Sequence, residues 1–399
     1  MAKPFLPALA ACLILAPPAV RAQQIDLLLP EGGVPGYGEK FSVLNEHRET
    51  ATGATGWEWN GVTLAPRIAV GGGYDSAPNG AVASARLNAA PSLLLTDPVA
   101  GFGAYAVVDT AAYPQDAAQN TVSAALAAGE RVTLPREVIT LAGGYLRGAV
   151  TGFDINAGPL YRPLVFTLRD LRASDEITAG LFTVTPEVEA DVFRFPKRTA
   201  LDRTDTHETA TIAYSQGGPL DYVIRLHATQ SDYGHVFPAA DTDEFLAGVE
   251  DREDGLWTVS FLAGAARRQS RDASLTAPVL EARLDWRPTS LDQVQLNLAH
   301  EIDDPDEISA TPYRLTEAKL SIIHDYLENV IFKGVAKVSN AAYMKENWNE
   351  TLFTASLEME WSLSPRLTLN GCYVFNNRQA NFLSAASEHV LTMQLAWSP

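Results

Sequence analysis

The sequence predicts an all-β fold, a transmembrane, antiparallel up-and-down β-barrel of roughly 18 strands (16–18), with short periplasmic turns and longer external loops. Three observations predict it. Apolar and polar residues alternate with a period of two over most of the chain. The alternating runs are long enough for tilted strands to cross a bilayer. The links between the runs alternate between short and long, as expected when every second turn faces the periplasm.

Composition limits the alternatives. The chain has 399 residues, a formal net charge of -18 and 46% hydrophobic residues. No run of about 18 apolar residues could span a bilayer as a helix, and a membrane protein without such a run must satisfy its backbone in a closed barrel. The acidic balance argues against nucleic acid as a partner, because phosphates require a basic surface.

Residues 1–22 are predicted to be a signal peptide. Lys3 supplies a positive start, the stretch from Phe5 to Val20 is apolar, and Val20-Arg21-Ala22 offers small residues for cleavage before Gln23. A buried N-terminal helix is the alternative. Removal of the signal also removes Cys12 and leaves Cys372, so an internal disulfide is excluded.

Residues 23–61 are predicted to form an irregular periplasmic N-terminal segment, either a leader or a plug-like lead into the first strand. Its glycines and prolines favour turns over strands. Residues 62–399 are predicted to be the barrel. The alternation is weakest between Val122 and Ala149, where alanine and glycine predominate.

The C-terminal third shows the alternation best. Leu280, Ala282, Leu284 and Trp286 interleave with charged residues, and the last run places Leu391, Met393, Leu395 and Trp397 on one face. A soluble β-sandwich could also alternate, but its strands average about five or six residues. Aromatic residues near the ends of the runs are typical of interfacial girdles; they are Trp257, Trp286, Tyr313, Trp361, Tyr373 and Trp397.

Polar and turn-forming residues mark the links between the runs. Short links are predicted at sites such as Leu134-Pro135-Arg136, Pro288-Thr289-Ser290 and Ser364-Pro365-Arg366. Longer polar links are predicted at Tyr113 to Asn120, Pro196 to Asp205, Ser231 to Asp243, Arg267 to Ser274, Asp303 to Thr311, Ala341 to Asn349 and Asn376 to Ser387.

Charged residues on the polar side of the runs are the candidate functional residues. They cannot face lipid, where a midplane Lys or Arg costs about 2–4 kcal/mol, so we expect them to face the lumen. A water-filled channel with tuned selectivity is one interpretation, and internal ion pairs that close the barrel are the other. The predicted lumen-facing residues are Glu187, Glu189, Asp191, Arg225, Glu281, Arg283, Asp285, Arg287, Lys333, Lys337, Glu358 and Glu360.

The sequence offers no catalytic, cofactor-binding or metal-binding motif of known spacing. The seven histidines are scattered, and pairs such as Asp205 with His207 are better explained as loop polarity than as a rim enzyme. The acidic stretch Asp303 to Glu307 lacks the glycine of a calcium loop. We therefore expect no enzyme activity, no cofactor and no metal.

In its sequence, the chain resembles the β-barrel porin family of Gram-negative outer membranes. The resemblance rests on Phe41 to Arg48, on Gly61 through Arg67 with Tyr74-Asp75, and on the hairpins from Leu320 to Trp397. It implies an outer-membrane barrel with a transport role. One departure is that Trp397 is followed by Ser398 and Pro399, whereas such barrels commonly end on an aromatic residue.

The leading hypothesis is a porin-like channel for passive diffusion of small hydrophilic solutes. The alternative is a structural or accessory barrel linked to export or anchoring of surface polysaccharide. Expected partners are outer-membrane lipid and lipopolysaccharide, the barrel-assembly machinery, and small solutes.

Overall fold

The computed structural model describes residues 28–29, 33–37, 56–77, 81–155, 162–234, 238–251, 256–271, 273–303, 312–344 and 347–399. The predicted signal peptide, residues 1–22, lies outside these ranges. The strands form one 19-stranded sheet. They are β1 (Trp57–Trp59), β2 (Val62–Asp75), β3 (Ser84–Asp97), β4 (Phe102–Ala112), β5 (Thr121–Leu134), β6 (Glu137–Val150), β7 (Leu164–Ala179), β8 (Phe182–Arg194), β9 (Arg203–Ser215), β10 (Leu220–Asp232), β11 (Ala240–Asp251), β12 (Trp257–Ser270), β13 (Ala273–Trp286), β14 (Asp292–Asp303), β15 (Tyr313–Leu327), β16 (Val330–Tyr343), β17 (Asn349–Ser364), β18 (Leu367–Ala380) and β19 (Ala386–Trp397). Two short 3-10 turns, η4 (Ala117–Gln119) and η5 (Thr199–Leu201), lie in connections.

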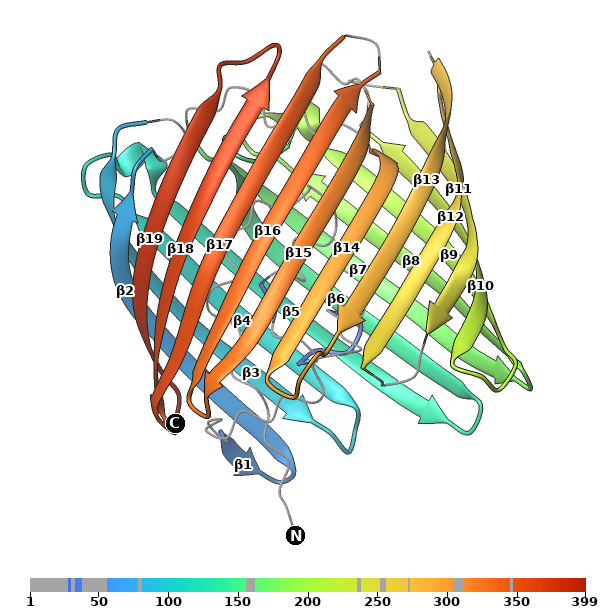
Figure 1. Cartoon of the computed structure of the whole chain (residues 1–399), viewed down its shortest axis with the longest axis horizontal. Helices are drawn as coiled ribbons and strands as arrows, with labels where there is room; N and C mark the ends of the chain where they lie inside the picture. Colours follow the sequence, from blue (N-terminus) through green and yellow to red (C-terminus); the bar gives the residue numbers. More distant parts are fainter. Residues whose placement is uncertain are drawn as a thin grey trace.

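The sheet closes into a barrel. From β2 to β19, each strand pairs antiparallel with the next along the chain, and β19 pairs with β2 from Val390↔Asp75 to Trp397↔Ile68 (Figure 1). The ring therefore has 18 strands, and the predicted up-and-down barrel is confirmed. Among the described residues, no helix has both the length and the apolar composition needed to cross a membrane.

The seam between β19 and β2 differs from the other strand pairs. Its ladder stops at Ile68, and the remaining edge of β2 pairs with the short strand β1, where Trp57 lies opposite Leu64. A Cβ atom on Gly71 or Gly73 would lie 2.1 Å from the Met393 carbonyl oxygen or 1.9 Å from that of Leu391. Glycine at these two positions therefore permits the close approach of β2 and β19.

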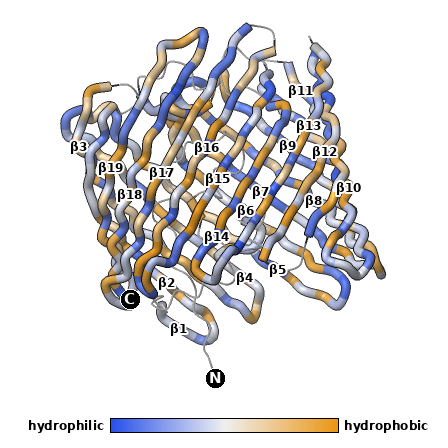
Figure 2. The backbone as a smooth tube through the Cα atoms, viewed as in Figure 1, coloured by the Kyte–Doolittle hydropathy of each residue, from blue (hydrophilic) through white to orange (hydrophobic). Residues whose placement is uncertain are grey.

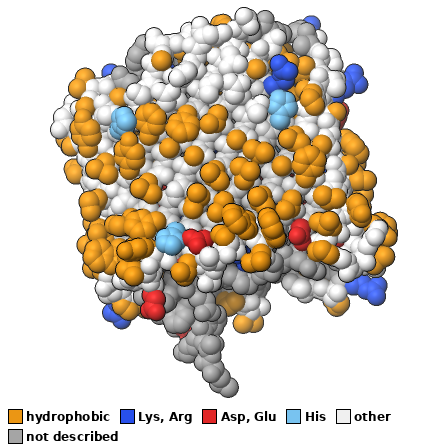
Figure 3. Space-filling model, viewed as in Figure 1, with side chains coloured by type: hydrophobic (Ala, Val, Ile, Leu, Met, Phe, Trp, Pro, Cys, Tyr) orange, Lys and Arg blue, Asp and Glu red, His pale blue; other side chains and the backbone are white. Residues whose placement is uncertain are grey.

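The two faces of the wall have opposite character. On β19, Val390, Thr392 and Gln394 are buried, while Leu391 and Met393 are each 53% exposed. Hydrophilic and hydrophobic positions alternate along the strands (Figure 2), and the visible outer face carries many hydrophobic side chains and few charged ones (Figure 3). An apolar outer surface around a more polar interior is the arrangement that a lipid environment requires.

The connections alternate between the two ends of the barrel. Short connections, such as residues 135–136, 180–181, 328–329 and 365–366, lie at the end where the C-terminus and β1 are found (Figure 1). Longer ones, such as residues 113–120 and 195–202, lie at the opposite end (Figure 1).

Several predicted long links are wrong. The stretch from Arg267 to Ser274 is almost entirely strand, because β12 runs to Ser270 and β13 begins at Ala273. The links predicted at Ala341 to Asn349 and Asn376 to Ser387 shrink to residues 344–348 and 381–385. Backbone pairing continues where both faces are polar, because strand residues beyond a bilayer need hydrogen bonds but no apolar face.

Aromatic residues mark the end with the short connections. Trp257 and Trp286 lie opposite each other with ring centroids 6.3 Å apart, and Trp361 and Trp397 lie at the same end of their strands. Tyr313 is an exception to the predicted girdle. It is 2% exposed on the inner face, where its hydroxyl donates to Asp303 Oδ2 at 3.1 Å.

Candidate functional site

The predicted charged residues of β8 lie on the inner side of the wall. On β8, Glu189 and Asp191 are buried, whereas the intervening Val188 is 48% exposed on the outer face. Glu187 lies on the inner side of the same alternation. These carboxylates therefore project into the barrel, as their strand positions require.

An ion pair crosses part of the interior between strands that are not neighbours. Arg225 Nη1 on β10 lies 2.6 Å from Glu281 Oε2 on β13, although β11 and β12 separate the two strands. Such a contact is possible only on the concave side of the wall. The two side chains keep 28% and 43% of their surface exposed, so solvent reaches this pair.

The remaining predicted residues on β13 form a local network. Asp285 accepts hydrogen bonds from Gln293 Nε2 at 2.7 Å and Gln295 Nε2 at 2.9 Å. Arg287 Nε lies 3.8 Å from Asp285 Oδ1, but it follows the last residue of β13 and so belongs to the turn. Arg283 lies between Ser260 and Asn297 in the strand register.

On β16 and β17, opposite charges face each other. Lys333 lies directly opposite Glu358 in the register, and Glu360 lies opposite Ile331. Lys337 Nζ is 2.8 Å from Glu317 Oε2 of β15. Ion pairing within the wall, one of the two interpretations of the sequence, is therefore present on this side of the barrel.

The structure adds residues that the sequence did not suggest. Asp170 and Arg172 of β7 are buried on the inner face, where Arg172 lies 3.1 Å from Asp170 and 3.2 Å from Glu189. In the register of neighbouring strands, Asp170 of β7 lies opposite Asp191 of β8, and Asp191 lies opposite Asp205 of β9. The inner side of β7, β8 and β9 therefore carries a row of three aspartates.

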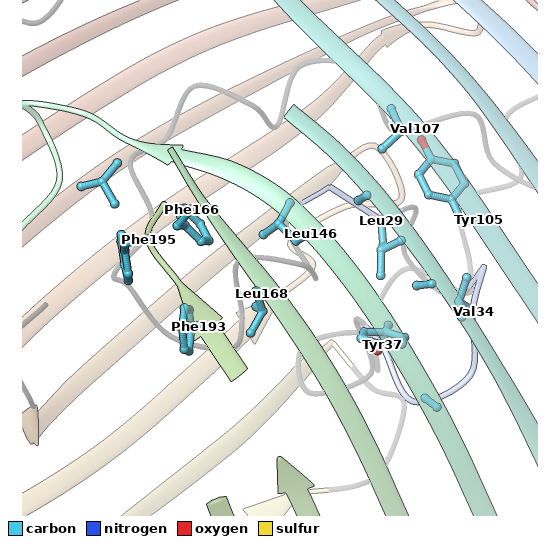
Figure 4. Packing of buried hydrophobic residues seen from close by; sticks show 14 of the residues in the cluster. Leu29, Val34, Tyr37, Tyr105, Val107, Leu146, Phe166, Leu168, Phe193 and Phe195 are labelled. Atoms are coloured by element: carbon cyan, nitrogen blue, oxygen red, sulfur yellow. The ribbon is translucent and has the colours of Figure 1, made fainter. Parts of the chain in front are cut away.

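Residues 28–29 and 33–37 lie inside the barrel. Leu29, Val34 and Tyr37 are buried against apolar residues of β4 to β7, among them Leu146 and Leu168 (Figure 4). The wall makes room for them with small residues. A Cβ atom on Gly103 would lie 2.3 Å from the Gly33 carbonyl oxygen, and one on Gly129 would lie 2.0 Å from that of Pro35.

Polar contacts fix this inner segment to β7. The Tyr37 hydroxyl donates to Asp170 Oδ1. Arg172 Nη1 donates to the Gly36 carbonyl oxygen at 3.2 Å, and its guanidinium carbon lies 4.6 Å from the centre of the Tyr37 ring. Of the segment predicted to be irregular, residues 28–29 and 33–37 therefore lie against the inner wall, whereas residues 57–59 form the short strand β1.

A second segment enters the interior from the end of the barrel with the long connections. In the connection between β6 and β7, Phe153 and Ile155 pack against Tyr313, Leu315, Ala341 and Leu352 of β15 to β17. Arg378 Nη1 of β18 donates to the Gly152 carbonyl oxygen. Because β6 and β7 lie on the other side of the ring from β15 to β18 (Figure 1), this connection crosses the barrel.

One group of side chains in the described part of the chain has the geometry to hold a metal ion. Carboxylate oxygens of Asp170, Glu189 and Asp191 lie within 4.8 Å of one another, and all three residues are buried. The sequence analysis predicted no metal, since residues 170 and 189 meet only through the pairing of β7 with β8.

Comparison with known proteins supports the resemblance. Residues 245–396 match the family model "Putative beta-barrel porin 2", which confirms the predicted family likeness over that part of the chain. No curated protein sequence matches. Among solved structures, the chain is similar to OpdK of Pseudomonas aeruginosa crystallised with vanillate, at 10% identity and a TM-score of 0.48, covering 84% of this chain and 99% of that one. It is also similar to OccK2 (OpdF) of the same organism, at 10% identity and 0.46, covering 84% and 97%. A BenF-like porin from Pseudomonas fluorescens Pf-5 matches at 9% identity and 0.44, covering 84% and 99%.

Proposed function

We propose that this chain is an outer-membrane channel for passive diffusion of small hydrophilic solutes. The observation that carries the proposal is the solvent-accessible charged inner wall, typified by Arg225 and Glu281, inside a closed ring of 18 strands. Rings of 16 to 18 strands are wide enough to leave an aqueous bore unless other segments fill it. The family match, residues 245–396, covers Glu281 and the strands from β12 to β19.

The outer surface supports residence in a membrane. Its exposed leucine, valine and aromatic residues suit contact with lipid, and its tryptophans suit the interface. We expect the surrounding partners to be outer-membrane lipid and lipopolysaccharide, reached through export by residues 1–22 and insertion by the barrel-assembly machinery.

Planar-bilayer recording tests the channel directly. Purified, refolded protein should give discrete ohmic steps with modest cation preference that fades at high salt, because the screening length falls from about 10 Å at 0.1 M salt to about 3 Å at 1 M. Glu281→Gln should lower the cation preference measured from the reversal potential under a salt gradient, because it removes a negative charge from the solvent-accessible wall.

Glu208→Gln is the matched control. Glu208 is exposed on β9 opposite the outward-facing Val188, so the same substitution there should leave the reversal potential unchanged. Absence of any current from protein that shows heat-modifiable migration, the mark of a folded barrel, would contradict the proposal. Strong anion selectivity would contradict the expected dominance of the acidic residues.

A further inference from the structure

The inner row of Asp170, Asp191 and Asp205 is unusual because like charges directly opposite each other on neighbouring strands repel. Arg203 Nε lies 2.7 Å from Asp205 Oδ2, so that aspartate has its own cation. Arg172 serves both Asp170 and Glu189. The central carboxylate, Asp191, lies between the other two aspartates, and within the described structure neither Arg172 nor Arg203 forms an ion pair with it.

Asp191 is also the most enclosed member of the row. It is 0% exposed, and neither of its carboxylate oxygens accepts a hydrogen bond within the part of the chain that the structure describes. The imidazole of His207 is the nearest basic group, with Nε2 3.8 Å from Asp191 Oδ2. A carboxyl group buried in such a position is stable only if it holds a proton, here shared with Asp170, or if a ligand or opposite charge compensates it.

We propose that Asp170, Glu189 and Asp191 bind a calcium ion on the lumen wall. Calcium takes oxygen ligands at about 2.3–2.6 Å, so oxygens of one coordination shell lie up to roughly 5 Å apart. The oxygens of these three carboxylates lie within 4.8 Å of one another. Each carboxylate oxygen carries two lone pairs, so the contacts with Arg172 and Tyr37 do not prevent Asp170 and Glu189 from acting as ligands.

The location of this site gives it a structural consequence. Asp170 accepts the Tyr37 hydroxyl, and Arg172 holds both the Gly36 carbonyl oxygen and the carboxylates. An ion bound here therefore stabilises the contact between residues 33–37 and β7. The proposal does not depend on whether the barrel conducts.

Terbium luminescence tests the site, since Tb³⁺ replaces calcium and is excited by energy transfer from a nearby tyrosine. Tyr37 contacts one of the three ligands directly. The full chain, refolded in detergent and stripped of divalent cations with a chelator, should show saturable Tb³⁺ emission that added Ca²⁺ displaces. Asp191→Asn should weaken the affinity for Tb³⁺ and Ca²⁺ by about tenfold or more.

Asp109→Asn is the matched control. Asp109 is a buried aspartate on β4 with one oxygen that no described residue contacts by a hydrogen bond, and it lies outside the three-carboxylate group. The Asp109→Asn variant should leave the affinity for Tb³⁺ and Ca²⁺ unchanged. Tyr37→Phe should reduce the emission, yet calorimetry should still detect calcium binding to that variant.

Heat-modifiable migration on gels establishes that each variant is folded. If Asp191→Asn does not fold, Glu189→Gln takes its place, with the same expected loss of affinity. Equal calcium affinity in wild type and in a folded Asp191→Asn or Glu189→Gln variant would overturn the proposal. So would the absence of saturable binding to the folded wild-type protein.

Discussion

Arg283 and Leu284 are adjacent on β13 and face opposite sides of the wall. Leu284 lies between Val259 and Leu296 on the outer face, whereas Arg283 lies between Ser260 and Asn297 on the inner face. We predict that Leu284→Arg impairs membrane insertion and that Arg283→Leu does not. Leu280→Arg, nearer the middle of β13, should be more harmful, with a cost of about 2–4 kcal/mol at the bilayer midplane.

The folded fraction after insertion into vesicles, read from heat-modifiable migration, measures this prediction. Arg283→Leu serves as the control within the same strand. If Arg283→Leu proved the more damaging change, the assignment of faces on β13 would be shifted by one residue.

Asp154, in the connection between β6 and β7, is predicted to make the packing of that connection sensitive to pH. Burial raises the pKa of its carboxyl to about 7, although hydrogen bonds from the Thr151 amide and hydroxyl oppose the shift. The neighbouring charged groups are Lys337, which lowers this pKa, Glu350, which raises it, and Arg378, which holds the Gly152 carbonyl oxygen.

The packed connection holds a proton that the released connection would lose above the ordinary pKa of 3.8. Its stability therefore falls as pH rises from about 4 towards 7 and stays low above that. Conductance should rise between about pH 4 and about pH 7 as the connection leaves β15 to β17. Asp154→Asn should flatten the profile. A persistent rise in that variant would assign the pH effect to another group.

At the residue scale, the sequence predicts the side of a strand on which a charge lies only where the two faces contrast chemically. Glu281, Arg283 and Asp285 alternate with apolar residues, so their common side was evident from the sequence. Asp170 was missed because Arg169 and Arg172 put charges on both faces of β7. Its proximity to Asp191 depends on the register between β7 and β8, which alternation alone cannot specify.

At the scale of elements, the segment at residues 33–37 fits a wall of small residues on β4 to β6. We predict that Gly129→Ala displaces it, because the added Cβ atom would lie 2.0 Å from the Pro35 carbonyl oxygen. Overpacking of this kind costs about 1–3 kcal/mol. The test uses a Cys372→Ser, Val34→Cys protein, whose cysteine at position 34 reports access to the segment. With Gly129→Ala added, this cysteine should react with a water-soluble maleimide about tenfold or more faster than it does without Gly129→Ala.

Gly143→Ala is the control for this experiment. Gly143 lies opposite Ala128 in the β5–β6 register, and a Cβ atom there would meet its nearest neighbours at 3.7 Å, which is ordinary contact. It should leave the labelling rate unchanged. Equal rates in both variants would show that Gly129 does not hold the segment in place.

The same small residues explain why β5 and β6 were the hardest elements to predict. Their inner positions, including Ala125, Ala127 and Ala142, pack against the inner segment and other buried residues. The inner face is therefore apolar there, and the contrast that alternation needs is lost. At the end with the long connections, several strands are longer than predicted, because their paired backbone continues into polar sequence.

For the whole molecule, the alternation of connections predicts the topology in the membrane. An epitope inserted between β10 and β11, in residues 233–239, should be accessible on intact cells. The same epitope between β13 and β14, in residues 287–291, lies at the other end of the barrel and should react only after the outer membrane is opened. Antibody binding to intact and permeabilised cells measures both. Surface reaction of the second insertion would invert the topology.

The strand number and the closed ring were predictable because each run must be long enough to cross a bilayer and no edge can face lipid. The two segments inside the barrel were not predictable at this level. Phe153 meets Leu315 and Val34 meets Leu168 only after the ring has closed, and neither contact leaves a periodic trace in the sequence.

The seam between β2 and β19 gives the ring a preferred order of hydrogen exchange. Its ladder covers only Val390 to Trp397, whereas β18 and β19 are paired from Ala386 onward. Gly71, Gly72 and Gly73 add no side-chain packing across it. Backbone amides with fewer neighbouring contacts open at lower free energy than those of the rest of a sheet. Amide protons of β2 and β19 along this joint should therefore exchange with deuterated solvent before those of β7 and β8, which are tied to the inner segment through Tyr37 and Arg172.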